Sequence, residues 1–352
     1  MDLTVCVCTH NRPRYVRDCL AGLRRQTVGD DRFAVLIVDS GSPEPARTEL
    51  ADLAREHAGV CLIRVAEPGV SAARNAGAAA AATDYIAYID DDAIPAETWV
   101  AAILDALAAP GVRPVVLGGR ILPKWEAPLP GWWPPSLRGV LSIIEHEGQG
   151  EFRSAELPAG MEPYACNMVV HVPSLLNTGG FGRGIGRIGA VLLSDEEVQL
   201  AWRLQDAGLS ARYDSRIVVF HQIQASRLNP AWLLSRLYWQ GTSTVLTRRL
   251  LRDGIGVWRE FPRRLVIARF SRRPRCGPLL RPDFLESVGD GLTRPALFVP
   301  RSAGERRKRP GGSRFPPRAG SYRDPLPMAR PRAELRRRVE RLPLAKVAAG
   351  LF

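Results

Sequence analysis

Three consecutive carboxylates, Asp90 to Asp92, follow an apolar run over residues 85–89. Side chains alternate between the two faces of a strand, so we expect Asp90 and Asp92 on one face and Asp91 on the other. Adjacent carboxylates repel each other unless a cation lies between them, and Mg²⁺ or Mn²⁺ with oxygen ligands fits that position. The triplet therefore predicts either a metal site that also holds substrate phosphates, or an acidic turn or helix N-cap ahead of Pro95.

A second acidic cluster, Asp195 to Glu197, opens a stretch of helical spacing over residues 195–207. A carboxylate at this place could remove the proton from an attacking hydroxyl, which contributes roughly 10²- to 10⁴-fold to a rate. Acidic residues at a helix N-terminus also complement the helix dipole, and this structural role explains the same pattern.

Two further residues of the N-terminal third, Asp39 and Arg74, could contact a nucleotide. Asp39 ends an apolar run and precedes Ser-Gly-Ser, so it could accept a hydrogen bond from a nucleobase or cap the helix that starts near Pro43. Arg74 lies on the helix predicted after Gly69 and could bind a diphosphate through its planar guanidinium, or be an ordinary surface charge.

The elements that would position these residues alternate in type over the first 120 residues. Strands are predicted at 3–8, 34–38, 60–65 and 85–89, and helices at 14–26, 45–57, 70–82 and 97–108. Strands separated by single helices indicate βαβ units and a largely parallel sheet. Ligands of such sheets bind beyond the carboxyl ends of the strands, so we expect residues 9–12, 39–42, 67–69 and 90–92 at one common edge.

The pattern is less regular after residue 120. A Trp- and Pro-rich segment over 121–160 predicts a lid or an irregular surface connection. A regular pattern returns over 164–172, a strand is then predicted at 217–220, and an amphipathic helix at 230–251. The sequence over 184–189 matches Gly-x-Gly-x-x-Gly, but no strand precedes it, so we interpret it as a loop and not as a dinucleotide site.

The net charge of +13 is concentrated in the last 52 residues. Fifteen of the 49 Lys and Arg residues and four of the 36 Asp and Glu residues lie in 301–352, so residues 1–300 keep 34 and 32 and are nearly neutral. With no nucleic-acid reader motif, this distribution argues against nucleic-acid binding. The tail predicts either peripheral contact with anionic lipid or a solvated, partly disordered extension.

The remaining composition predicts a cytoplasmic protein. The six cysteines show no Cys-x-x-Cys spacing, which favours buried thiols in a reducing compartment. The chain opens directly on a strand-like run, and no apolar run reaches the ~20 residues needed to span a bilayer.

In order and spacing, these motifs resemble the inverting family 2 glycosyltransferases, which have the GT-A fold and transfer a sugar from a nucleotide-sugar. The resemblance covers about residues 3–250 and is carried by segments 5–13, 37–42, 67–77, 88–92, 118–120, 166–168, 179–181 and 194–203. It implies an α/β, GT-A-like, Rossmann-type fold: a mostly parallel sheet flanked by helices, a helical C-terminal region and a basic, partly disordered tail. The expected division is a nucleotide-sugar-binding half (1–120), an acceptor-binding and catalytic half (121–225), a helical extension (226–300) and the tail (301–352).

The resemblance also implies roles for individual residues. Substrate or nucleotide contacts would come from Thr9, Asn11, Arg12, Asp39, Gly69, Arg74, Asn75, Asp90 and Asp91. Asp90 and Asp92 would hold Mn²⁺ or Mg²⁺, and His221 would complete that ligand set, orient the pyrophosphate or be structural. Relatives carry a Glu-Asp pair about two helical turns before an arginine. Counting back from Arg203 places Glu196 on the Glu and Glu197 on the Asp, so Glu197, Glu196 and Asp195 are all candidates for the base.

The sequence therefore predicts a metal-dependent inverting glycosyltransferase. Asp39 is compatible with a uracil base, so a UDP-sugar is the expected donor, and the acceptor would be a lipid-linked, polysaccharide or natural-product molecule. One alternative is a nucleotidyltransferase, but those enzymes usually have a Gly-rich loop after the first strand, where this chain has Thr-His-Asn-Arg. The other is a nucleic-acid- or membrane-binding protein driven by the basic tail.

Overall fold

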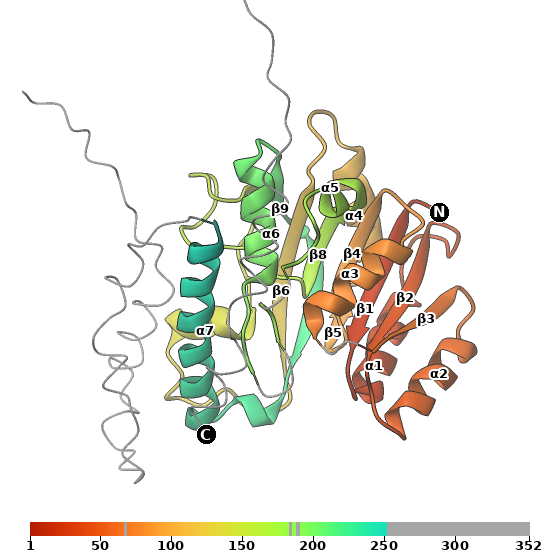
Figure 1. Cartoon of the computed structure of the whole chain (residues 1–352), viewed down its shortest axis with the longest axis horizontal. Helices are drawn as coiled ribbons and strands as arrows, with labels where there is room; N and C mark the ends of the chain where they lie inside the picture. The colour runs from red at the N-terminus through yellow and green to blue at the C-terminus, as the bar shows by residue number, and fades with distance from the viewer. Residues whose placement is uncertain (67–68, 183–184, 188–190, 252–352) are drawn as a thin grey trace, which may run out of the picture. The chain divides into compact units, whose positions relative to one another are not determined.

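The N-terminal strands form the parallel half of one mixed sheet (Figure 1). The computed structural model describes residues 1–66, 69–182, 185–187 and 191–251, all within Met1–Arg294, one of the two compact units of the chain. In this half the strand order is β3-β2-β1-β4, and each neighbouring pair is parallel. The strands are β1 (Leu3–Thr9), β2 (Phe33–Ser40), β3 (Val60–Val65) and β4 (Tyr85–Asp90).

One helix follows each of these strands, as the alternating pattern predicted. They are α1 (Pro13–Leu23), α2 (Ala46–Glu56), α3 (Val70–Ala80) and, after β5 (Ala93–Pro95), α4 (Trp99–Ala108). α1 begins at a proline, whose fixed φ suits the first helical position. The side chains of β1 and β4 are buried along nearly their whole length, because helices cover both faces of this half of the sheet.

The other half of the sheet mixes strand directions. β8 (Asn167–His171) pairs antiparallel with β4, β6 (Val116–Trp125) pairs antiparallel with β8, and β9 (Ala211–Ile223) pairs parallel with β6. β5 and the short β7 (Gln149–Glu151) both pair antiparallel with β9. The strand predicted over 217–220 is therefore part of the longer strand β9, which pairs with β5, β6 and β7.

Asn167, in one of the resemblance motifs, links this half of the sheet internally. Its Nδ2 donates to the carbonyls of Arg120 (2.9 Å) and Ile217 (2.8 Å), and its Oδ1 accepts from Trp99 Nε1 (2.8 Å). The buried amide thus satisfies three polar groups from three different elements, so this motif contributes to the architecture.

The Trp- and Pro-rich segment contains the end of β6, the 3₁₀ helix η1 (Pro135–Leu141) and β7, and part of it packs on α7 (Pro230–Leu251). Trp133 stacks near Trp232 of α7, with ring centroids 6.5 Å apart. These residues belong to a second apolar cluster, separate from the core around β1, β4 and β8. Part of the segment therefore packs against the rest of the fold in this structure.

The remaining helices are α5 (Val172–Asn177), α6 (Glu196–Asp206) and the 3₁₀ helix η2 (Ala225–Arg227). Within the described residues, no helix is both long enough and apolar enough to cross a membrane. The predictions for 252–300 and for the tail 301–352 fall outside the described residues, as do Glu67 and Pro68.

Candidate functional site

Hydrogen bonds tie together the loops that follow the parallel strands. Thr9 Oγ1 donates to Asp91 Oδ2 (2.7 Å), the backbone N of Asn11 donates to Ser42 Oγ (2.8 Å), and the backbone N of Gly69 donates to Ser40 Oγ (3.2 Å). The ends of β1, β2 and β4 and the start of α3 therefore meet at one edge, as the parallel topology predicted.

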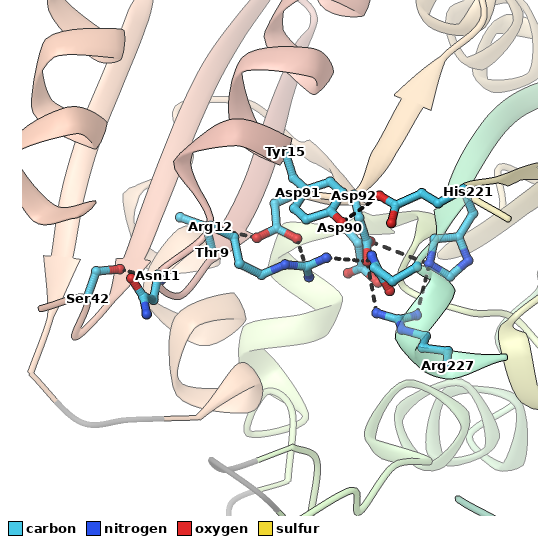
Figure 2. A network of polar contacts seen from close by, with 12 residues as sticks. Thr9, Asn11, Arg12, Tyr15, Ser42, Asp90, Asp91, Asp92, His221 and Arg227 are labelled. Carbon is cyan, nitrogen blue, oxygen red and sulfur yellow. Dashed lines mark hydrogen bonds and ion pairs between the residues drawn. The ribbon is translucent and has the colours of Figure 1, made fainter. Parts of the chain in front are cut away.

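Arg12 joins two of the three consecutive aspartates. Its Nη1 donates to Asp91 Oδ1 and its Nη2 to Asp92 Oδ2, both at 2.7 Å, while its guanidinium lies 4.4 Å from the ring centroid of Tyr15. β4 ends at Asp90, so strand alternation does not extend through the triplet. The prediction that Asp91 faces away from Asp92 is wrong in this respect, because both carboxylates lie against one arginine (Figure 2).

Asp92 is the most heavily partnered member of the triplet. Besides Arg12, its Oδ2 accepts from Gln224 Nε2 (2.9 Å) and from Arg227 Nη2 (3.0 Å), and its Oδ1 lies 3.5 Å from His221 Nε2. The pairing of Ala93 in β5 with His221 in β9 brings the imidazole beside Asp92. Burial alone would raise the pKa of Asp92, but His221, Arg227 and Arg12 hold that pKa well below its usual value.

Asp91 differs from Asp92 although both are buried. Burial raises the pKa of Asp91 to about 7, against the opposing effects of Arg12 and of the hydrogen bond from Thr9. Asp90 is the exposed member, with 37% of its side chain accessible. The triplet therefore presents one carboxylate to the outside and keeps two in an internal polar network.

Arg74 connects the triplet to the second acidic cluster. Its Nη1 donates to Glu196 Oε1 (2.5 Å), and its Nη2 lies 3.4 Å from Asp90 Oδ1. Arg74 and Glu196 are 122 residues apart in the sequence, and both side chains are 5% exposed. The N-terminus of α6 thus faces the end of β4 across one guanidinium.

The carboxylate of Asp195 is used to dock α6 onto α7. Its Oδ1 accepts from Gln240 Nε2 (2.7 Å) and from Ser194 Oγ (3.0 Å), and its Oδ2 accepts from Thr244 Oγ1 (3.4 Å). The residue has a positive φ of 72° at the position before the helix. Asp195 therefore has a structural role in this arrangement.

Glu197 is the carboxyl group of this cluster with the least polar support. Burial, followed by the neighbouring Glu196, raises the pKa of Glu197 to about 8. In the part of the chain that the structure describes, neither Glu197 Oε2 nor Glu196 Oε2 has a hydrogen-bond partner. These two buried oxygens therefore keep hydrogen-bonding capacity that the described part of the fold does not use.

Other residues expected at a nucleotide site also have roles within the fold. Asn75 Oδ1 accepts from the backbone N of Phe181 (2.8 Å), and Asn75 Nδ2 donates to the carbonyl of the same residue (3.0 Å). Asp39 is buried, and its Oδ1 accepts from the backbone N of Ser42 (2.9 Å) in the turn before α2. Arg64 Nε lies 3.6 Å from Asp39 Oδ2. The nucleotide contacts assigned to these residues stay predictions.

Arg227 and Gln224 were not predicted from the sequence, although both contact Asp92. They lie in and just before η2, a 3₁₀ turn of three residues that has no periodic pattern. Gln240 and Thr244 were missed as well, although they occupy i and i+4 positions of α7, a spacing that places two polar side chains next to each other on one face of the helix.

The chemistry of the donor set suits a divalent cation, while its present arrangement favours arginine. His221 Nδ1 donates to the carbonyl of Leu141 (3.0 Å), which directs Nε2 toward Asp92 Oδ1. Within the described ranges, however, no three His, Cys, Asp or Glu side chains are grouped so as to hold a metal ion. Arg227 contacts both Asp92 (3.0 Å) and His221 (3.4 Å), so a guanidinium lies where their polar atoms converge (Figure 2).

Comparison with known proteins finds glycosyltransferases. The model of the family described as glycosyl transferase family 2 matches residues 4–133. A pre-mycofactocin glycosyltransferase of Mycobacterium tuberculosis is 27% identical over 242 residues, which cover 66% of this chain and 46% of that protein. A glucosyl-dolichyl phosphate glucuronosyltransferase of Haloferax volcanii is 26% identical over 246 residues, covering 69% of this chain and 76% of that protein. The match thus spans about half the length of the M. tuberculosis relative.

A solved structure shares the fold. The mannosyltransferase PcManGT from Pyrobaculum calidifontis, in complex with GDP-Man and Mn²⁺, superposes with a TM-score of 0.51 at 18% sequence identity. The superposition covers 82% of this chain and 69% of that chain. This likeness confirms the predicted GT-A-like α/β architecture.

Proposed function

Because residues 4–133 match the model of glycosyl transferase family 2, we propose that the protein transfers a sugar from a nucleotide-sugar to an acceptor, with inversion at the anomeric carbon. The observation that carries this proposal is the placement of Arg74 between Asp90 and Glu196. Arg74 thus places the aspartate triplet, proposed to bind the nucleotide-sugar, opposite Glu196 and Glu197, each of which has one oxygen without a hydrogen-bond partner in the described residues. An inverting transfer needs these two functions on opposite sides of one sugar.

On the donor side, the proposed ligands of a divalent ion are Asp90, Asp92 and His221. Such an ion would supply stabilisation of the negative charge that develops on the departing diphosphate. Arg74 and Arg12 bring two further positive charges to the same edge, and Arg12 keeps Asp91 and Asp92 together. The exposed Asp90 is the member of the triplet that a bound donor reaches first.

On the acceptor side, we assign the base to Glu197. Both oxygens of Asp195 are bound to their structural neighbours, and Glu196 is committed to Arg74 through one oxygen. A base works best when its pKa lies near the working pH, and the pKa of Glu197 is raised to about 8. Glu197 would accept the proton of the acceptor hydroxyl as that oxygen attacks the anomeric carbon.

The donor is proposed to be a UDP-sugar, on the basis of Asp39 at the end of β2. The similar solved mannosyltransferase holds GDP-Man, so a guanosine donor is the first alternative to compare. The relative named for glucosyl-dolichyl phosphate supports a lipid-linked acceptor, while a polysaccharide or natural-product acceptor fits the same proposal.

The proposal can be tested by ligand-induced thermal stabilisation. UDP, GDP and dTDP are each added with Mn²⁺ to the wild-type protein and to the Asp90→Asn variant. A nucleotide present at 100 times its Kd stabilises the folded state by about 2.7 kcal/mol. Asp90 is partly exposed, so its replacement should leave the fold intact and reduce the stabilisation.

The matched control for Asp90→Asn is Arg216→Gln, which breaks an ion pair with Asp214 on β9. Its response to nucleotide should equal that of the wild-type protein. Absence of stabilisation by all three nucleotides, or equal stabilisation of wild type and Asp90→Asn, contradicts the proposed donor site.

A further inference from the structure

Arg227 is a largely buried cation that contacts the proposed metal ligands directly. Its side chain is 12% exposed and comes from η2, which follows β9. Nη2 lies 3.0 Å from Asp92 Oδ2 and Nη1 lies 3.4 Å from His221 Nε2. One guanidinium therefore contacts both of the buried side chains that are proposed to hold a divalent ion.

The position of this guanidinium depends on the charges around it. Burial lowers the pKa of Arg227, as do the nearby charges of Arg187 and Arg12, while Asp92 raises it. Asp92 is thus the main counter-charge of Arg227, and Arg12 shares the same carboxylate oxygen. A divalent ion placed beside Asp92 would add two positive charges next to two arginines that already depend on that carboxylate.

We propose that Arg227 is the resident cation of the Asp92–His221 pair, and that it opposes binding of a divalent metal ion until a diphosphate group enters with the ion. This inference rests on the proposed nucleotide-sugar function. The diphosphate supplies the negative charge that compensates the ion, and its oxygens are partners that a guanidinium binds in bidentate fashion. Arg227 then turns from Asp92 to the diphosphate, so metal and diphosphate bind cooperatively through this side chain.

A purely structural role for Arg227 makes a different prediction. If the side chain merely fixes η2 to the sheet, its loss should lower stability and weaken every ligand alike. If it is the resident cation, its loss should strengthen binding of the metal alone and weaken the coupling between metal and diphosphate. Coupling free energies are reciprocal, so the same factor must appear in the affinity of either ligand.

The experiment is a titration of Mn²⁺ followed by electron paramagnetic resonance, in which protein-bound Mn²⁺ loses the signal of the free aqueous ion. It is run on the full chain without nucleotide and with UDP or GDP, whichever binds, after correction for Mn²⁺ bound by nucleotide in solution. The variants are Arg227→Gln and, as a matched control on the same strand region, Arg216→Gln. Arg227→Met, which keeps much of the buried stem, replaces Arg227→Gln if the latter does not fold.

In the wild-type protein, nucleotide should lower the Kd for Mn²⁺ by about tenfold or more. Arg227→Gln should bind Mn²⁺ alone about tenfold more tightly than wild type and should lose most of the effect of nucleotide, whereas Arg216→Gln should match wild type. Unchanged or weaker Mn²⁺ binding by Arg227→Gln, in a wild type that does show nucleotide-dependent Mn²⁺ binding, overturns the inference alone. No Mn²⁺ binding by wild type with any nucleotide overturns the proposed metal site and the inference together.

Discussion

Arg74 and Glu196 form an ion pair between two side chains that are nearly inaccessible to solvent. The pair joins α3 to the N-terminus of α6 and leaves the second nitrogen of Arg74 facing Asp90. A buried pair is weak support for stability in itself, but removal of one partner leaves an uncompensated charge in the interior. A substitution of Arg74 therefore tests both the stability of the fold and the link between the two acidic clusters.

Arg74→Ala should lower the free energy of unfolding by about 3–5 kcal/mol, because Glu196 is left buried without its cation. The double variant Arg74→Met with Glu196→Met should recover much of that loss, since it removes both charges and keeps similar volume. Urea denaturation of the two variants measures the effect. The control is Arg55→Ala, which breaks an exposed pair with Asp52 and should cost at most about 1 kcal/mol. If Arg74→Ala costs no more than this control, the expected cost of leaving Glu196 buried without its cation is wrong.

The pH dependence of turnover should identify the base. If Glu197 must lose its proton to act, kcat/KM should fall about tenfold for each pH unit below its pKa of about 8 and level off above it. Glu197→Gln should reduce kcat by roughly 10²- to 10⁴-fold and remove this limb of the profile. Asp195→Asn should retain more activity, because Asp195 acts through its contacts with α7.

Two results would reassign that role. A profile that is flat between pH 6 and 9 in the wild-type protein would exclude a base with the pKa of Glu197. Full loss of turnover in Glu196→Gln, with turnover kept in Glu197→Gln, would place the base on Glu196.

The stability of the fold should also depend on Glu162, a half-buried carboxyl group outside the proposed transfer step. Burial raises the pKa of Glu162 to about 7, against the effects of a hydrogen bond from Trp202 Nε1 (2.9 Å) and of Arg153. The folded protein therefore keeps a proton here that the unfolded chain releases near pH 4.5. This contribution, about 3 kcal/mol, is complete below pH 4.5 and is lost as the pH rises through 7.

Glu162→Gln should remove that dependence and keep the acceptor for Trp202. The measurement is the free energy of unfolding from pH 5 to pH 8 for wild type and variant. Asp91 and Glu197 also have raised pKa values and act in the same direction, so the difference between the two proteins isolates Glu162. Parallel curves for the two proteins would show that Glu162 does not hold its proton in the folded state.

The parallel half of the sheet was predictable because its signals are local. β3 matches its predicted range, β1 and β4 each extend one residue beyond theirs, and β2 begins one residue earlier and ends two residues later than predicted. The apolar run, the following helix and the polar residue at the strand end all lie within a short stretch of sequence. Parallel topology then places the strand ends at one edge without further information.

The mixed half and the partners of the carboxylates have no such local signal, and His221 beside Asp92 was implied only by the family resemblance. β9 pairs with β5, β6 and β7, and this pairing decides that His221 reaches Asp92. Arg227 reaches the same carboxylate from 135 residues away, through a 3₁₀ turn that no periodic pattern marks. The strand rule likewise failed for Asp91, because β4 ends one residue earlier. Such partner choices depend on tertiary packing, which no local spacing encodes.

Asn75 offers a test of whether a residue expected to bind nucleotide acts through the fold instead. Its amide holds both backbone groups of Phe181, whose ring lies 5.6 Å from the guanidinium of Arg74 and packs edge-on against Tyr88. Asn75→Ala leaves the backbone N and carbonyl of Phe181 without these partners, and should lower the free energy of unfolding by about 1–3 kcal/mol.

Gly180 makes the role of Asn75 testable by a double-mutant cycle. Gly180 has a positive φ of 77°, and a Cβ at this position would collide with Asn75 Oδ1. Gly180→Ala should therefore be strongly destabilising in the wild-type background. In the Asn75→Ala background the collision is absent, so the cost should fall to the backbone strain alone, about 1 kcal/mol. If Gly180→Ala costs the same with and without Asn75, Asn75 does not hold the Gly180–Phe181 turn. Its side chain would then be available to contact the nucleotide-sugar.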